Sequence, residues 1–291
     1  MNLAPAAAFT ASATWAFATS RYTRASREVG STRVNLARTC VALPAFVGMR
    51  LLAGGGPFLA GVTPLGATWL VVSIVCSYAL ADSLFLTACR RVGLTTALSI
   101  ASTYPLWAAV WGTVVDHEPV GAGRAVGMLL AVGGVVWLVQ LGNGGATGSA
   151  QRDTAGLGLA VTASLLWALN SIGVKRGAAG MNLFDVNVFR FTVAFLILSP
   201  QLWLPSERVR ARAPAGGWLI LLPALLADCV LGSLCYVYGL SNTDLAVGAT
   251  LSSLAPLISV PFAIAAGEEH FDLRRLGAIV ATVTGIALLV R

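Results

Sequence analysis

The sequence predicts an all-α integral membrane protein whose ten transmembrane helices form two inverted five-helix repeats. Three observations lead to this fold class. Of the 291 residues, 57% are hydrophobic and only 11% are charged, whereas a soluble domain carries roughly 25% charged residues. Long segments without any charged residue recur along the chain. Motifs of the first half also return in the second half, in the same order.

The charge-free segments are long enough to cross a bilayer as helices. A spanning helix needs about 20 mostly apolar residues, whereas a membrane barrel is built from shorter, alternating segments. The first expected helix precedes an arginine cluster at 21–27 and has no basic region before it, so we expect a retained helix and not a signal peptide. Glycine-rich connections at 54–57 and 142–145 end the second and fifth helices. The ten expected helices are 3–20, 34–53, 67–89, 95–115, 121–141, 155–173, 186–204, 216–240, 244–266 and 273–290.

The two halves of the chain share motifs at a nearly constant offset. The matched pairs are TASATWA (10–16) with TASLLWA (162–168), Val34, Asn35 and Arg38 with Val186, Asn187 and Arg190, SIASTYPL (99–106) with TLSSLAPL (250–257), and Arg124 and Gly127 with Arg274 and Gly277. Shared composition explains recurring Leu and Ala, but not paired Asn, Arg, Trp and Pro. We therefore predict an internal duplication, with repeats at 1–141 and 155–291 joined by a loop at 142–154.

An odd number of helices in each repeat determines how the repeats are related. A second repeat that starts after five crossings enters the membrane from the opposite side, so a pseudo-twofold axis in the membrane plane relates the two. Many secondary transporters use this arrangement, with a solute site near the bilayer midplane.

Two acids are candidates for a site inside the membrane. Asp228 lies at the centre of the eighth expected helix, and Asp82 lies a little past the centre of the third. A carboxylate in hydrocarbon is costly, so such residues usually face a cavity or a partner. Nothing within one turn of Asp228 on its own helix can pair with it. Either the two acids form a proton relay or cation site, or they are structural acids that are protonated or paired with arginine.

Several polar, aromatic and proline residues complete the candidate translocation path. Asn35 with Arg38 and Asn187 with Arg190 recur near helix starts, which favours a structural role at the turn. Snorkelling of the arginines to the interface and direct contact of the arginines with the substrate are the alternatives. Pro105 and Pro256 each free a backbone carbonyl and indicate kinks along a pathway. The expected cavity-wall residues, for each of which core packing is the alternative, are Trp15, Tyr104, Trp167, Asn170 and Tyr236.

Other classes of function receive little support from the sequence. The net charge of +7 comes from short basic clusters between apolar runs, where the positive-inside rule places them, so we expect no nucleic-acid partner. The five cysteines form no CxxC pair, and the two histidines follow the fourth and ninth helices on opposite faces. We therefore expect no metal and no cofactor. Small residues repeat every four positions in helices five and ten, as in Gly277, Ala281 and Gly285, which is typical of close helix packing.

The chain resembles the EamA-type transporters of the drug/metabolite transporter superfamily. The resemblance lies in LLWALNSIGVKRG at 165–177, in the arginines and prolines named above, and in the acids Glu118 and Glu268 after helices four and nine. It implies a transporter, not an enzyme, that moves a small metabolite, such as an amino acid. The inverted repeats imply alternating access, and the two intramembrane acids make a proton or another cation the expected coupling ion. The alternative is an integral-membrane enzyme that acts on a lipid or another membrane-embedded substrate. We find no HExxH, P-loop or GxSxG motif that would favour that alternative.

The distribution of basic residues predicts an orientation in the cell membrane. Loops after the odd-numbered helices hold twelve arginines, and the opposite face holds five basic residues. The positive-inside rule then places both termini outside, whereas the family resemblance implies that both lie inside. We adopt the orientation from the charge count. The twelve arginines are Arg21, Arg24, Arg27, Arg33, Arg90, Arg91, Arg152, Arg208, Arg210, Arg212, Arg274 and Arg275.

Overall fold

The computed structural model describes residues 3–54, 56–141, 153–203, 213–214, 216–258 and 273–290. Across these residues the secondary structure is helical, with turns between the helices and no strand. Four helices are long and apolar enough to cross a membrane: Ser31–Ala53, Pro64–Val92, Thr154–Gly177 and Trp218–Ser241. Shorter apolar helices accompany them. The chain is therefore an all-helical, multi-pass membrane protein, in agreement with the predicted class.

The first half of the chain begins with two long helices, α1 (Ala4–Val29) and α2 (Ser31–Ala53), which meet at Gly30. Pro64–Val92 is continuous and consists of α3 (Pro64–Ile74), the π-helical turn η1 (Val75–Ala81) and α4 (Asp82–Val92). Thr63 starts it, because its side chain accepts a hydrogen bond from the Gly66 amide at 3.0 Å and proline occupies the first turn. The remaining elements are α5 (Leu94–Ala101), α6 (Tyr104–Val115) and α7 (Ala122–Leu141).

The second half of the chain follows the same plan. It contains α8 (Thr154–Gly177), α9 (Leu183–Leu198) with the 3₁₀ turn η3 (Pro200–Trp203), and then Trp218–Ser241. That helix is assembled from η4 (Trp218–Leu221), α10 (Leu222–Leu225), the π-helical turn η5 (Leu226–Gly232) and α11 (Ser233–Ser241). The last described helices are α12 (Leu245–Ser252) and α14 (Leu273–Val290).

Three expected helices differ in outline from the structure. One is the ninth, expected at 244–266, which is interrupted at Ser253 and Leu254, where α12 has ended. The first continues to Val29, so the arginine cluster at 21–27 lies within α1 and not in a loop. The fourth, expected at 95–115, is interrupted at Ser102 and Thr103. Pro105 follows this interruption directly; because proline lacks an amide hydrogen and fixes its φ angle, it is tolerated in the first turn of α6 and not within a continuous helix.

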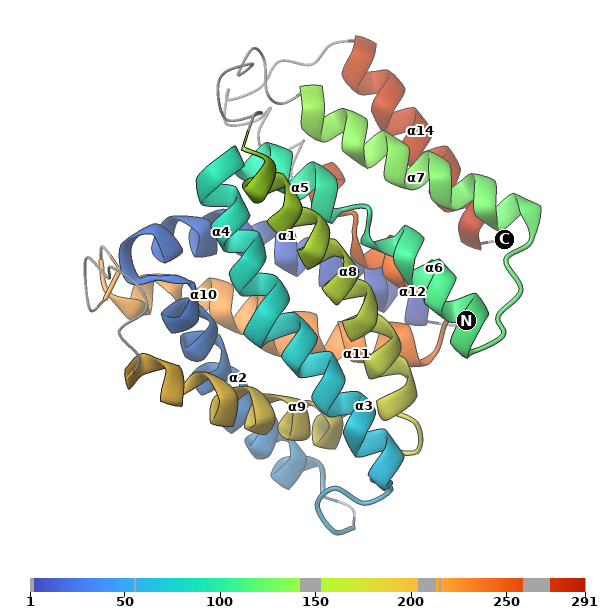
Figure 1. Ribbon diagram of the computed structural model, residues 1–291. Helices are drawn as coiled ribbons and strands as arrows, with labels where there is room; N and C mark the ends of the chain where they lie inside the picture. Colours follow the sequence, from blue (N-terminus) through green and yellow to red (C-terminus); the bar gives the residue numbers. More distant parts are fainter. Residues whose placement is uncertain are drawn as a thin grey trace.

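The internal duplication is visible in the structure as well as in the sequence. Each repeat has one seven-residue π-helical turn, η1 or η5, in the middle of its third long helix. The helices α2 and α9 pack against one another, as do α7 and α14 (Figure 1). At these two positions, equivalent helices of the two repeats therefore meet as pairs.

Close approach between α7 and α14 depends on glycine. A Cβ atom built on Gly285 would clash with the backbone of Ala131 and with the Gly127 carbonyl. A Cβ atom built on Gly277, by contrast, would lie 3.2 Å from the side-chain ring of Trp137. The small-residue pattern in these helices thus places Gly285 at the tighter contact. This pair stands at one side of the bundle, in green and red (Figure 1).

Candidate functional site

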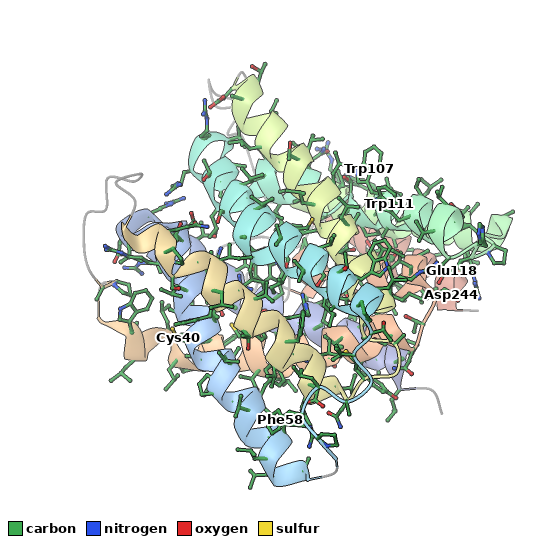
Figure 2. The ribbon with its side chains drawn as sticks, turned by 60° about the horizontal axis from the view of Figure 1, so that its bottom comes forward. Cys40, Phe58, Trp107, Trp111, Glu118 and Asp244 are labelled. Carbon is green, nitrogen blue, oxygen red and sulfur yellow. The ribbon has the colours of Figure 1, made fainter. Side chains whose placement is uncertain are left out.

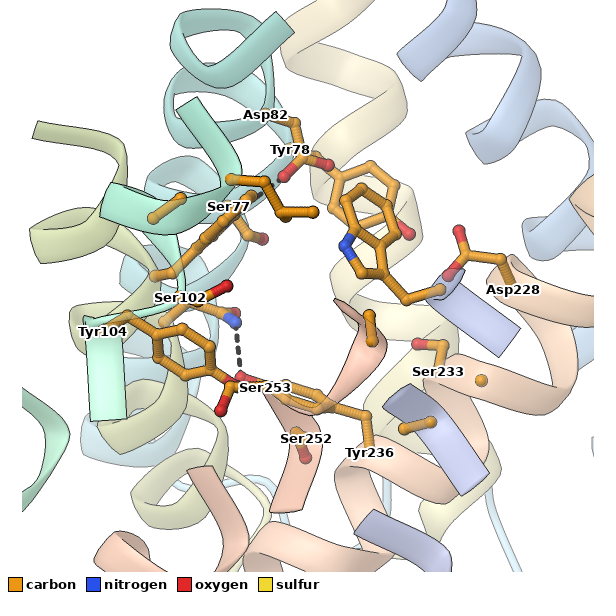
Figure 3. A pocket seen from close by; sticks show the side chains of 18 of the residues that line it. Ser77, Tyr78, Asp82, Ser102, Tyr104, Asp228, Ser233, Tyr236, Ser252 and Ser253 are labelled. Atoms are coloured by element: carbon orange, nitrogen blue, oxygen red, sulfur yellow. Dashed lines mark hydrogen bonds between the residues drawn. The ribbon is translucent and has the colours of Figure 1, made fainter. Parts of the chain in front are cut away.

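A cavity of about 140 Å³ lies in the middle of the bundle. Its wall is built from both repeats: α1, α2, η1, α4, α5 and α6 contribute from the first, and α8, α9, η5, α11 and α12 from the second. Figure 3 shows acidic and aromatic side chains around this space, with Asp82 and Asp228 on different sides of it. All seven residues expected on the translocation path line the cavity: Trp15, Asp82, Tyr104, Trp167, Asn170, Asp228 and Tyr236.

The centre of this wall is an arginine bound by two carboxylates. Arg38 is 4% exposed. Its Nη2 lies 3.1 Å from Asp228 Oδ2, and its Nη1 forms an ion pair with Asp82. Asp228 therefore has its charged partner on another helix, as the empty surroundings on its own helix require. We name this group, Arg38 with Asp82 and Asp228, the buried ion triad.

The expected roles of Arg38 need correction. It does not snorkel to the interface, and in the described structure its hydrogen bonds go to side chains and not to backbone groups at a turn. Besides the two acids, it donates to Asn35 Oδ1 at 3.1 Å and to Tyr78 Oη at 3.2 Å. The reason is that α2 starts at Ser31, so Arg38 lies two turns inside the helix.

Aromatic rings surround the guanidinium of Arg38. Its Cζ atom lies 4.2 Å from the centroid of Tyr78, 5.0 Å from that of Tyr22 and 5.4 Å from that of Trp15. Ring faces attract a cation at such distances. Trp15 also packs edge-on against Trp167, with centroids 6.2 Å apart. The cavity therefore combines charged groups with a wall of aromatic rings.

The π-helical turn η1 brings Asp82 and Tyr78 to the cavity. A π turn widens the helix and leaves one backbone carbonyl without its usual partner. Asn35 Nδ2 donates to the Tyr78 carbonyl at 3.0 Å. Asp82, directly after the turn, accepts from Trp167 Nε1 at 2.9 Å. Asn35 itself is fully buried and supports the site from behind the wall.

A second arginine, Arg190 on α9, faces the cavity from the other repeat. It is 2% exposed. Its Nε donates to Ser73 Oγ at 3.1 Å, and its Nη2 donates to Asn170 Oδ1 at 3.0 Å. Asn170 in turn donates to the Tyr236 hydroxyl at 2.9 Å. Its hydrogen-bonding partner, expected because an amide on an apolar face must be satisfied, is therefore found.

The remaining expected residues lie at or behind the wall. Pro256 lines the cavity, whereas Pro105 and Asn187 are buried outside it. Asn187 Oδ1 accepts a hydrogen bond from Ser233 Oγ at 2.7 Å. Tyr104 lines the cavity, and its hydroxyl donates a hydrogen bond to the Ala249 carbonyl at 2.8 Å. This hydrogen bond connects the start of α6 to α12.

Sequence reasoning missed several polar residues of the wall. Small hydroxyl side chains are common in membrane helices and give no pattern of their own. Tyr78 could have been found, because it occupies the position equivalent to Asp228 at an offset of 150 residues. The missed residues are Ser77, Tyr78, Ser102, Ser233, Ser252 and Ser253 (Figure 3).

One end of the bundle is closed by ion pairs. Glu118 pairs with Lys175, and its Oε2 accepts from the Leu245 amide at 2.8 Å, at the start of α12. Lys175 also donates to the Thr243 carbonyl at 2.6 Å. Figure 2 shows Glu118 and Asp244 close together at this end.

The arginine on α2 near this end is also buried. Arg50 Nε lies 3.0 Å from Asp185 Oδ1. Between the cavity and these ion pairs lie fully buried apolar side chains such as Val174 and Leu240, each about one turn beyond a cavity residue. The cavity is thus separated from this face of the protein by an apolar layer and an ionic layer.

No group of three or more His, Cys, Asp or Glu side chains that could hold a metal ion exists among the described residues. His117 follows α6, and its described position is outside the cavity wall. His270 and Glu268 lie outside the residues that the structure describes.

Comparison with known proteins gives a family and a fold. The profile of the EamA-like transporter family matches residues 2–140 and again 154–291. A solved crystal structure of another protein superposes with a TM-score of 0.78 at 19% sequence identity, over 98% of this chain and 94% of that chain. No match is found among curated proteins.

Proposed function

Because the chain belongs to the EamA-like transporter family, within the drug/metabolite transporter superfamily, we propose that it is a secondary carrier of a small metabolite in the cell membrane. An amino acid or a similar solute is the substrate class we propose. The observation that carries the proposal is the buried ion triad, because its members come from both repeats and line one central cavity.

An ion triad shared between repeats suits alternating access. Arg38 and Asp82 belong to the first repeat, and Asp228 belongs to the second. If the repeats rock against one another, the contact between Arg38 and Asp228 is one that can be made in one conformation and lost in the other. A proton or a cationic group of the substrate can then replace the arginine at Asp228. Coupling would arise because the released carboxylate is costly without a partner.

The test is transport by purified protein in sealed vesicles. Wild-type protein should exchange a labelled substrate, identified by a thermal-shift screen against metabolites, because a ligand of the folded state raises stability. Asp228→Asn keeps the side-chain shape, removes the charge and leaves the Arg38–Asp82 pair in place. It should still exchange substrate but lose accumulation against a gradient. Full gradient-driven uptake by Asp228→Asn would reject Asp228 as the coupling residue.

This proposal implies ten membrane crossings, provided that each interrupted helix is counted as a single crossing. The segments α5 and α6 then form the fourth crossing, and α12 begins the ninth. With the arginine-rich loops on the cytoplasmic side, both termini lie outside. A cysteine introduced at Arg91 should then resist an impermeant thiol reagent in whole cells. Labelling of that cysteine would place both termini inside.

A membrane-bound enzyme, the alternative considered from the sequence, finds no specific support in the arrangement of the cavity. The same vesicle experiment separates the two. A transporter returns the labelled solute unchanged, whereas an enzyme alters it covalently. Chromatography of the recovered solute makes the distinction.

A further inference from the structure

The two equivalent arginines of the repeats have different electrostatic surroundings. Arg38 is bound by two carboxylates. Arg190 is equally buried, but its hydrogen-bond partners Ser73 and Asn170 are neutral. Within the described part of the chain, no carboxylate forms an ion pair with Arg190, and its Nη1 atom has no hydrogen-bond partner. Arg190 lines the cavity, so this free donor belongs to the wall.

The repeat explains why the counter-charges are missing. Equivalent contacts align the third long helices of the repeats: Asn35 lies 3.5 Å from Ser83 Oγ, and Asn187 lies 2.7 Å from Ser233 Oγ. The two serines are 150 positions apart in the sequence. At this offset, residues around Arg38 can be matched one by one with residues around Arg190.

Both acids of the buried ion triad have neutral counterparts. Asp82 corresponds to Gly232, and Asp228 corresponds to Tyr78. Both counterparts line the cavity. A side chain at Gly232 would also collide with Thr14, so this position has no room for an acid. The second repeat therefore keeps the arginine and lacks the carboxylates.

A buried cation without a counter-charge is costly, and a ligand anion can offset that cost. The formal charges at the cavity are one excess negative charge on the buried ion triad and one positive charge on Arg190. Both charges lie against neighbouring turns of the same helix, α8. Trp167 on α8 donates a hydrogen bond to Asp82, and Asn170 on α8 accepts one from Arg190. Trp167 and Asn170 are three residues apart, which corresponds to about 4.5 Å along the helix axis.

We propose that Arg190 is an anion-binding subsite of the substrate cavity, and that the substrate is a small zwitterion. Its anionic group, of the size of a carboxylate, binds the guanidinium of Arg190. Its cationic group faces Asp82 and Asp228, a few atoms away. Planar guanidinium groups suit carboxylates because they donate two parallel hydrogen bonds. This inference rests on the proposed function, since it describes the substrate of the same cavity.

The test uses binding of simple anions to the purified full chain in detergent, so it can fail independently of vesicle transport. Thermal unfolding is followed against sodium acetate and against free glycine, at constant ionic strength and with no other carboxylate in the buffer. Both probes should raise the unfolding temperature of the wild type by mass action. Asn170→Asp supplies a counter-charge to Arg190 with almost no change in size, and its second carboxylate oxygen can accept a hydrogen bond from the Tyr236 hydroxyl, to which the native amide donates. It should weaken the affinity for both probes by at least about tenfold.

Two further variants complete the design. Arg190→Gln should lose the response as well, whereas Arg91→Gln, far from the cavity and in an exposed ion pair, should keep it. If acetate and glycine leave the wild type unchanged, or stabilise Asn170→Asp equally, the proposal is wrong. It is also wrong if chloride stabilises as well as acetate and glycine adds nothing in chloride, because Arg190 would then hold an inorganic ion and not the substrate.

Discussion

Replacement of Arg38 by glutamine should destabilise the protein strongly. The guanidinium is 4% exposed and contacts two carboxylates, Asn35 and Tyr78. Removing it leaves Asp82 and Asp228 buried without the cation that both of them contact. Breaking a buried ion pair by removing one partner costs about 3–5 kcal/mol. We expect Arg38→Gln to lose an amount in this range.

The double variant Arg38→Gln with Asp228→Asn distinguishes two causes of the lost stability, the uncompensated charge of the acid and the lost packing of the arginine side chain. If most of the loss comes from the uncompensated acid, the second substitution should recover part of it, because Asp82 keeps its bond to Trp167. Lost packing against Tyr22 and Tyr78 would not be recovered.

The assay is equilibrium unfolding of the purified protein in mixed micelles, with the free energy extrapolated to zero denaturant. Arg91→Gln is the matched control, because it removes the same charge from an exposed ion pair with Asp153 and should leave stability nearly unchanged. If Arg38→Gln is as stable as this control, the buried ion triad does not stabilise the fold and the reasoning fails.

Three further predictions concern other parts of the molecule. Gly285→Ala should cost about 1–3 kcal/mol and more than Gly277→Ala, because the first meets backbone and the second a movable ring; equal folded yields would contradict this. Glu118→Gln should lower the unfolding temperature, since it weakens the bonds to Lys175 and to the start of α12, and an unchanged temperature would exclude an ionic closure there. The Arg91 guanidinium and the Gly156 amide hold the pKa of Asp153 below its usual value. The contribution of the Asp153 carboxylate to the free energy of unfolding is therefore present above its unfolded pKa, near 3.9, and is lost as the pH falls through its lower folded pKa. The difference in stability between the wild type and Asp153→Asn should vanish only in acid.

Some features of this protein follow from local sequence. Hydrophobic runs with almost no charge predict helices in a membrane, because lipid offers no partners to an open backbone. The recurrence of Asn35 and Arg38 as Asn187 and Arg190 predicts the duplication. Proline at position 105 indicates the interruption before α6, although the sequence could not show that the break falls at Ser102 and Thr103.

The identity of the charge partners depends on tertiary structure. Arg38 and Asp228 are 190 positions apart, and no local pattern brings them together. The helices Pro64–Val92 and Trp218–Ser241 each contain a π-helical turn, η1 and η5. A π turn shifts the direction in which the following side chains point, so it influences which of them reach the cavity, and residue spacing in the sequence does not reveal it. The sequence by itself determined the class, the repeats and the list of unusual polar residues, because those depend on burial in lipid. Only the packing of the helices decided that one arginine is neutralised and its equivalent is not, because ion pairing depends on distances of a few ångströms between helices that lie far apart along the chain.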